Sequence, residues 1–299
     1  MRWVAAAAVL TGLGIAAARN LEELRDVDLE VRPGWLAAAL PLTAFASVAL
    51  PRAWHRTVLA LGGRLAVAAG VRIWWQSQAA RFVVTMVGTA AGRAAMAARE
   101  GVRLQVAAAA QVLELLLLIG WSVLLGALPG SGAPVPAGLR AALLVGAVAG
   151  LAALPWSARR ALDLVHRYRP QVEATTVDHA GLVAATAAYG LNAVLRSGAF
   201  VLVAAGLLPV GGDDVLLLVA AWNLAAVAGI IGITPAGIGV REGVMIALLQ
   251  DRFGLGGAAA LAAAWRAWEL AFEVASVAAV TAVGRRQRSG AAGAQSSTT

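Results

Sequence analysis

The sequence predicts an all-α fold, a polytopic integral membrane helical bundle of about 7–8 membrane segments with two broken or re-entrant helical segments. Apolar residues make up 60% of the 299 residues, and charged residues make up 13%, which is about half the share found in soluble domains. One helical crossing needs ~20 apolar residues, so eight crossings would use about 160 residues and leave the rest for loops and tails. The chain has no contiguous polar block long enough to fold as a separate soluble domain.

The predicted spans follow the apolar stretches in chain order. They cover about residues 3–18, 34–53, 105–128, 139–154, 180–208, 215–233 and 258–283, with a shorter apolar piece at about 240–249. Pro41 and Pro51 fall inside the second span, where neighbouring helices can satisfy the freed backbone groups. We expect a single transmembrane domain over residues 1–284 and a disordered, basic and polar cytoplasmic tail over residues 285–299.

Arginine is distributed unevenly between the predicted loops. The loops at 52–72 and 156–178 and the C-terminal tail are rich in arginine, whereas the loops at 19–33, 129–138 and 209–214 are acidic or neutral. Because arginine-rich loops stay in the cytoplasm, the sequence predicts a multi-pass membrane protein with both termini in the cytoplasm. The net charge of +8 then indicates contact with anionic lipid, and nucleic-acid binding is not expected.

The first irregular segment covers residues 73–103. Arg81 and Arg93 bracket an apolar core of 11 residues, which is too short to cross a bilayer and is typical of a re-entrant or interfacial segment. With Arg99 and Arg103, these two arginines are predicted to form a basic surface on the inner side. That surface either contacts anionic lipid as part of the topology or recruits phospholipid headgroups to a cavity mouth.

The second irregular segment covers residues 233–246. Pro235, Gly237 and Gly239 break the helix between two apolar runs, and a new helix is expected from about residue 240 with Arg241 and Glu242 in its first turn. Non-helical backbone at membrane depth is tolerated only where protein buries it or where it lines a wet cavity. An exposed helix N-terminus there binds anions such as phosphate. The two charged residues either hold and orient a lipid phosphate or serve as a helix cap with a structural ion pair.

Two of the predicted spans each contain one isolated charged residue. Arg196 is in the middle of span 180–208, where a charge costs about 2.5–3.5 kcal/mol on insertion scales. It is expected either to meet an anionic headgroup or to pair with an acid on a neighbouring helix. Glu114 is an isolated acid in span 105–128, so we expect it to be protonated or paired with an arginine of the basic loop.

The last span carries a row of three charges. Arg266, Glu269 and Glu273 are spaced i, i+3 and i+7 and therefore share one helix face. We expect Arg266 and Glu269 to neutralise each other, which leaves Glu273 to meet Arg196 or Arg241. The alternative is a proton-linked role for a carboxylate of this row.

The residues of both irregular segments resemble those of a known family. Thr234-Pro-Ala-Gly-Ile-Gly-Val-Arg-Glu-Gly243 resembles the Pro-Gly-Gly-x-Gly-x-Arg-Glu signature of the lysylphosphatidylglycerol synthase transmembrane family of flippase-like proteins. Trp75-Gln-Ser-Gln-Ala-Ala-Arg-Phe, followed by Gly92-Arg93 and Gly101-Val102, looks like that family's earlier re-entrant motif. The resemblance covers nearly the whole chain and implies the membrane half of two-part synthases, which is implicated in moving lipid between leaflets.

The resemblance and the charge pattern together imply a lipid flippase of the bacterial cytoplasmic (inner) membrane. It would move a phosphate-bearing lipid, either a phospholipid or a polyprenyl-phosphate-linked lipid. The predicted headgroup-binding residues are Arg81, Arg93, Arg196, Pro235, Gly237, Gly239, Arg241 and Glu242. The predicted intramembrane charge partners are Glu114, Arg266, Glu269 and Glu273. No metal site or cofactor is expected, and because the chain has no cysteine, it has no thiolate nucleophile or Cys-ligated metal. No convergent set of acid and base residues is visible either, so an enzyme is not predicted. The alternative is a non-catalytic membrane accessory subunit that docks a lipid-modifying glycosyltransferase or synthase.

Overall fold

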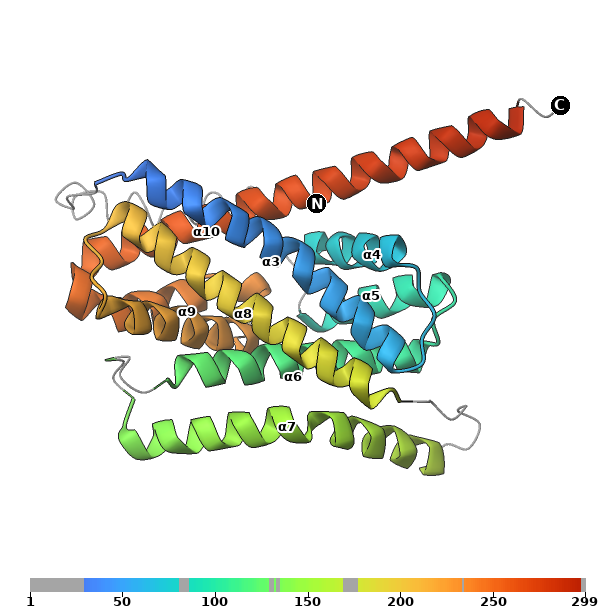
Figure 1. Ribbon diagram of the computed structural model, residues 1–299, viewed down its shortest axis with the longest axis horizontal. Coiled ribbons are helices and arrows are strands. Elements are labelled where there is room, and N and C mark those ends of the chain that lie inside the picture. Colours follow the sequence, from blue (N-terminus) through green and yellow to red (C-terminus); the bar gives the residue numbers. More distant parts are fainter. Residues whose placement is uncertain are drawn as a thin grey trace.

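A computed structural model describes residues 30–80, 86–128, 132, 135–168, 177–232 and 234–296. Within these ranges the regular structure is entirely helical, with no strand (Figure 1). The elements are α3 (Pro33–Ala60), α4 (Val67–Ala80), α5 (Met86–Arg99), α6 (Leu104–Gly126), α7 (Ala137–Tyr168), α8 (His179–Leu207), α9 (Asp214–Ile231), the 3-10 turn η1 (Pro235–Gly237) and α10 (Val240–Ser296). The predicted all-α class is therefore confirmed.

Six of the described helices are long and apolar enough to cross a membrane. They are Pro33–Ala60, Leu104–Gly126, Ala137–Arg160, His179–Leu207, Asp214–Ile231 and Val240–Val283. Their outward faces carry large apolar side chains, such as Phe45 at 57% and Val145 at 70% exposure. Large apolar surfaces of this kind are characteristic of lipid-facing helices. These features indicate a membrane protein; the predicted first span at residues 3–18 lies outside the described residues.

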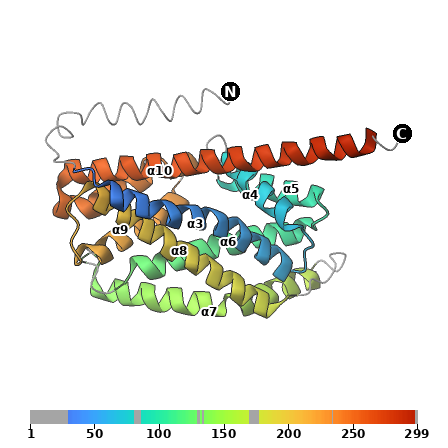
Figure 2. The ribbon, with the colours of Figure 1, turned by 45° about the horizontal axis from the view of Figure 1, so that its top comes forward.

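Long helices that follow one another along the chain, such as α6 and α7 or α8 and α9, pack in opposite directions (Figures 1 and 2). α3 and α8 run side by side, because the N–H of Asp178 bonds the carbonyl of Ala60 at one end and the N–H of Arg32 bonds the carbonyl of Gly206 at the other. α9 packs against α6, α8 and α10, while α7 lies at the edge of the bundle against α6 and α8. Buried side chains of α3 to α8 form one core cluster, and those of α3, α8, α9 and α10 form a second.

α10 contains a sharp turn at Gly254, where φ is 72°. In an unbroken helix, residues 28 positions apart would be separated by about 42 Å. Yet Arg241 makes an ion pair with Glu269, so the helix formed by 240–253 must fold back on the helix that follows. The predicted short apolar piece therefore becomes a helix of about 21 Å, which is shorter than the ~30 Å hydrocarbon core.

The predicted interruption at 73–103 is also present. It contains two helices of 14 residues each, α4 and α5, which contact one another at the end of the bundle where α3 ends and α8 begins (Figure 1). At about 21 Å each, these helices are also shorter than a bilayer's hydrocarbon core. Gly101, with φ of 87°, then turns the chain into α6.

Two segments are more helical than predicted. α7 continues through the basic region that follows the predicted span 139–154, up to Tyr168. α10 is helical as far as Ser296, whereas the sequence predicts a disordered tail from residue 285. Both extensions are rich in alanine and arginine, and these residues have high helix propensity.

Candidate anion site at the broken helix

The break between α9 and α10 is built from backbone conformations that favour glycine. α9 ends at Ile231 and is followed by Gly232 with extended backbone. Ala236, Gly237 and Gly239 then have φ values of 55°, 68° and 84°, in the left-handed region that favours glycine. The N–H of Gly239 donates to Glu242 Oε2 at 2.7 Å, which is half of a capping box. Glu242 therefore caps α10, as one of the two predicted roles requires. The first N–H groups of α10 point into the break, where they have no intrahelical acceptors.

Gly237 fixes the position of this break against α9. A Cβ added at Gly237 would lie 2.8 Å from both the Cα and the carbonyl oxygen of Gly229, and backbone atoms cannot move aside as a flexible side chain can. Gly229 in turn faces the side chain of Arg241, which lies 3.3 Å from a Cβ built there. The glycine pair thus allows the broken segment to approach α9 closely and sets the position of Arg241.

We expect Gly237→Ala to destabilise the fold by about 1–3 kcal/mol, because it combines left-handed backbone with a backbone clash. Gly243→Ala is the matched control, since it lies inside α10 and, among the described residues, no atom lies within 4 Å of a Cβ built there. Thermal unfolding in detergent should show a lower midpoint for Gly237→Ala and an unchanged or slightly higher one for Gly243→Ala. Equal midpoints would show that the close approach does not constrain the fold.

The turn at Gly254 divides α10 into a first arm, residues 240–253, and a second arm, residues 255–296. Three charged residues, one from α8 and one from each arm of α10, converge beside the break. Arg196 Nη1 lies 2.6 Å from Glu269 Oε1, and Arg241 Nη2 bonds Glu269 Oε2. The carboxylate therefore uses a different oxygen for each guanidinium group. The guanidinium of Arg241 also stacks over the Trp222 ring, 4.2 Å from its centroid. Glu269 is buried, whereas 20% of the Arg196 side chain and 13% of the Arg241 side chain are exposed.

The charged residues of the last span also contact residues outside that span. Among the described contacts, Arg266 lies with its Nε 3.8 Å from Glu242 Oε1, and Glu269 reaches across to Arg196 and Arg241. The turn at Gly254 thus gives both residues partners outside the last span, and the expected Arg266–Glu269 pairing itself stays a prediction. Glu273, predicted to meet one of the two arginines, lies one turn further along α10 and is half-buried.

A second charge cluster lies between α4, α5 and α6. Arg93 makes an ion pair with Glu114, and each side chain is only 3% exposed. Glu114 also accepts from Trp74 Nε1 at 2.9 Å and from Gln111 Nε2 at 2.8 Å, and Arg93 Nε donates to Ser77 Oγ at 2.7 Å. Of the two states expected for Glu114, the structure has the one in which an arginine pairs with it; that arginine lies in the irregular segment 73–103. The predicted placement of Arg93 on a basic surface is wrong, because α5 turns this side chain into the core.

The two clusters share one arrangement of residues. In each, a tryptophan on one helix lies beside an arginine on the next short helix, and that arginine pairs with a glutamate on the following long helix. The residues are Trp74, Arg93 and Glu114 in the first cluster and Trp222, Arg241 and Glu269 in the second. Nineteen positions separate the tryptophan from the arginine in both. The first cluster is sealed, whereas the second is partly exposed and holds an additional arginine, Arg196.

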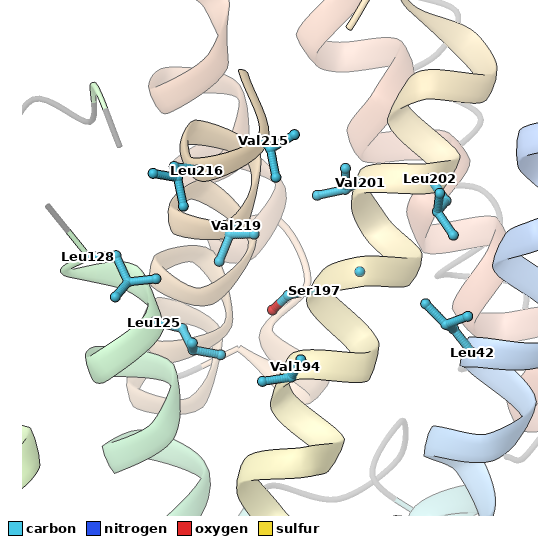
Figure 3. Close-up of a pocket in the computed structure, with 11 residues that line it drawn as sticks. Leu42, Leu125, Leu128, Val194, Ser197, Val201, Leu202, Val215, Leu216 and Val219 are labelled. Carbon is cyan, nitrogen blue, oxygen red and sulfur yellow. The ribbon is translucent and has the colours of Figure 1, made fainter. Parts of the chain in front are cut away.

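An apolar groove of about 420 Å³ lies between the same helices that carry part of the exposed cluster. Leu42, Val194, Val201, Val219 and other apolar residues of α3, α6, α8 and α9 line it (Figure 3). Ser197 lies at its wall, and its hydroxyl accepts a 2.8 Å hydrogen bond from Asn223. These two residues directly follow Arg196 and Trp222 in the chain, so the groove and the charged cluster share the helices α8 and α9.

The structure brings together part of the predicted headgroup site. Arg196, Gly237, Gly239, Arg241 and Glu242 gather at the start of α10, and Pro235 begins η1 beside them. Arg93 belongs to the sealed cluster, and Arg81 lies outside the described residues. The tryptophans under the two paired arginines were not predicted as site residues. The equal spacing of Trp74–Arg93 and Trp222–Arg241 is the signal that could have identified them.

The donor set of the exposed cluster suits an anion rather than a metal. Its described residues provide three guanidinium groups, from Arg196, Arg241 and Arg266, and two carboxylates. Within the described ranges, no group of three or more histidine or acidic side chains is placed to hold a metal ion. Comparisons of the chain with protein-family models, with curated proteins and with solved structures gave no match.

Proposed function

We propose that this chain is a non-enzymatic lipid translocator of the bacterial cytoplasmic membrane that moves a phosphate-bearing lipid between leaflets. The observation that carries the proposal is the convergence of Arg196 and Arg241 on one carboxylate beside the broken start of α10. Guanidinium groups recognise phosphate as well as carboxylate through paired N–H donors. A helix N-terminus beside them adds partial positive charge to the same place.

The depth of this cluster supports transport rather than surface binding. If the turn at Gly254 lies at one membrane surface, the helix formed by 240–253 reaches only about 21 Å into the hydrocarbon core. Arg241, in its first turn, would then lie within the ~30 Å slab and not at the opposite interface. The dominant barrier to lipid translocation is removal of the headgroup's charge from water. Charged donors at that depth would lower this barrier.

The apolar groove complements the charged cluster. It is lined by aliphatic side chains from four helices and falls within the ~300–1,000 Å³ range of ligand pockets. In the proposed function, the groove holds part of an acyl chain while the phosphate lies near Arg196 and Arg241. The lipid would thus remain in apolar surroundings along its tail and in polar surroundings at its head.

The proposed orientation places the loop at residues 61–66 in the cytoplasm and the loop at 208–213 outside. Because the chain has no cysteine, single cysteines report on this directly. We expect Gly212→Cys, at an exposed site, to react with a membrane-impermeant maleimide in intact cells. Arg64→Cys, also exposed, should react only after permeabilisation. The reverse pattern would contradict the proposed orientation.

The translocation proposal is tested with the full chain in vesicles. Phosphatidylglycerol with a fluorophore on a short acyl chain is incorporated, and dithionite then bleaches the fluorophore in the outer leaflet. We expect wild-type vesicles to bleach well beyond the outer-leaflet share, and protein-free vesicles to stop there. A phosphate-free lipid, fluorescent glucosylceramide, should be translocated much more slowly. Equal bleaching in wild-type and protein-free vesicles for phosphatidylglycerol and for a polyprenyl-phosphate lipid would refute the proposal.

A further inference from the structure

We infer that Glu269 is an internal counter-ion that occupies the phosphate position, and that a substrate phosphodiester binds by replacing its carboxylate between Arg196 and Arg241. This inference rests on the proposed function and specifies how the site discriminates its ligand. It assigns Glu269 a specificity role that differs from the simple charge neutralisation expected from its place on the helix.

The geometry of the bridge carries the inference. The two carboxylate oxygens of Glu269 are shared between two guanidinium groups on different helices, Oε1 with Arg196 and Oε2 with Arg241. The two non-bridging oxygens of a phosphodiester are arranged in the same way, one for each guanidinium group. Within the described residues, Arg196 Nε is also buried without a hydrogen-bond partner. A phosphate has more acceptor positions than a carboxylate and could satisfy this donor.

The sealed cluster shows what a purely structural pair looks like in this molecule. There Glu114 accepts from Arg93, Trp74 and Gln111 and is inaccessible. Glu269 is equally buried, but both of its arginine partners are partly exposed and lie beside a helix N-terminus. A ligand could therefore reach the arginines of the second cluster and not Arg93.

The neighbouring residues provide a place for the displaced carboxylate. Arg266 lies three positions before Glu269 on the same helix, and side chains at this spacing can pair. In the structure, Arg266 Nε lies 3.8 Å from Glu242, which is too long for a direct hydrogen bond. A carboxylate displaced from Arg196 and Arg241 therefore stays close to the guanidinium group of Arg266 on its own helix.

The test measures binding of a soluble phosphodiester, dihexanoylphosphatidylglycerol, to the full chain in detergent by calorimetry. In Glu269→Gln the side chain keeps its size but loses the charge that competes for the two arginines. We expect this variant to bind the probe about tenfold more tightly than wild type, within the usual range of coupling between linked sites. Glu114→Gln, the counterpart in the sealed cluster, should bind it with wild-type affinity.

Equal or weaker binding by Glu269→Gln would overturn the inference. Should Glu269→Gln fail to fold, Glu269→Asp serves instead, because its shorter side chain cannot bridge both arginines; its binding should also be tighter, and wild-type affinity would count against the idea. Inorganic phosphate is the second probe. If Glu269→Gln strengthens the binding of the phosphodiester more than that of inorganic phosphate, the ligand is a lipid headgroup; the opposite order indicates a free anion. Tighter binding by the variants, in a protein that translocates no lipid, would uphold the counter-ion role and reject the proposed function. Lipid translocation by wild type, without tighter binding by the variants, would uphold the proposed function and reject the counter-ion role.

Discussion

Arg241→Gln is expected to slow translocation of fluorescent phosphatidylglycerol about 10- to 100-fold. The variant removes one guanidinium group from the phosphate position, and a hydrogen bond to a charged group contributes about 1.5–3 kcal/mol, which corresponds to a rate change of that size. Arg241→Lys should have an intermediate rate, because lysine retains the charge but lacks the planar fork and the stacking over Trp222. Vesicle bleaching with equal amounts of reconstituted protein measures these rates.

The matched control for this experiment is Arg160→Gln. Arg160 is exposed on α7, at the edge of the bundle and outside both charge clusters. Its replacement changes the net charge by the same amount as Arg241→Gln. A loss of rate in Arg160→Gln as large as that in Arg241→Gln would show that total charge, not the site beside the broken helix, governs the rate.

Arg93→Met is expected to destabilise the protein by about 3–5 kcal/mol, the usual cost of removing one partner from a buried ion pair. The substitution leaves Glu114 charged in a core where both side chains were 3% exposed. The double variant Arg93→Met/Glu114→Met should be more stable than Arg93→Met alone, because well-packed apolar residues can replace a buried pair at little cost. Chemical unfolding in mixed micelles measures both.

A stability loss below about 0.5 kcal/mol for Arg93→Met, the range of ordinary surface substitutions, would contradict a sealed structural role for this pair. The same measurement on Arg160→Met gives that surface reference within this protein. Failure of the double variant to recover stability would indicate that Trp74 and Gln111, which both donate to Glu114, depend on the carboxylate itself.

The breaks in the helices could be predicted from the sequence because they depend on the backbone preferences of individual residues. Pro235, Gly237 and Gly239 exclude a continuous helix, and the structure has a 3-10 turn and three positive φ values there. The apolar core of 11 residues between Arg81 and Arg93 likewise indicated that 73–103 is interrupted. Whether a segment is helical, and where its helix is interrupted, depends on residues that are close together in the chain.

The charge pairs could not be predicted in the same way, because they depend on how distant helices pack. Helical spacing correctly put Arg266, Glu269 and Glu273 on one face, but it could not show that Glu269 would meet Arg196, 73 positions away. The reversal at Gly254 decides this pairing, and the Gly254-Leu-Gly-Gly257 run was its only local signal. For Arg93, burial depends on the rotation of α5 against α6, which a short amphipathic helix does not fix by itself.

The central claim is that a lipid phosphate lies between Arg196 and Arg241, within the hydrocarbon slab. A structure of wild type and of Glu269→Gln in nanodiscs of phosphatidylglycerol tests this most directly. We predict phosphate density within hydrogen-bond distance of both guanidinium groups in Glu269→Gln, and in wild type wherever the Glu269 carboxylate has left the two arginines. Headgroups confined to the two membrane surfaces in both proteins, with an empty position between the arginines of Glu269→Gln, would contradict the account.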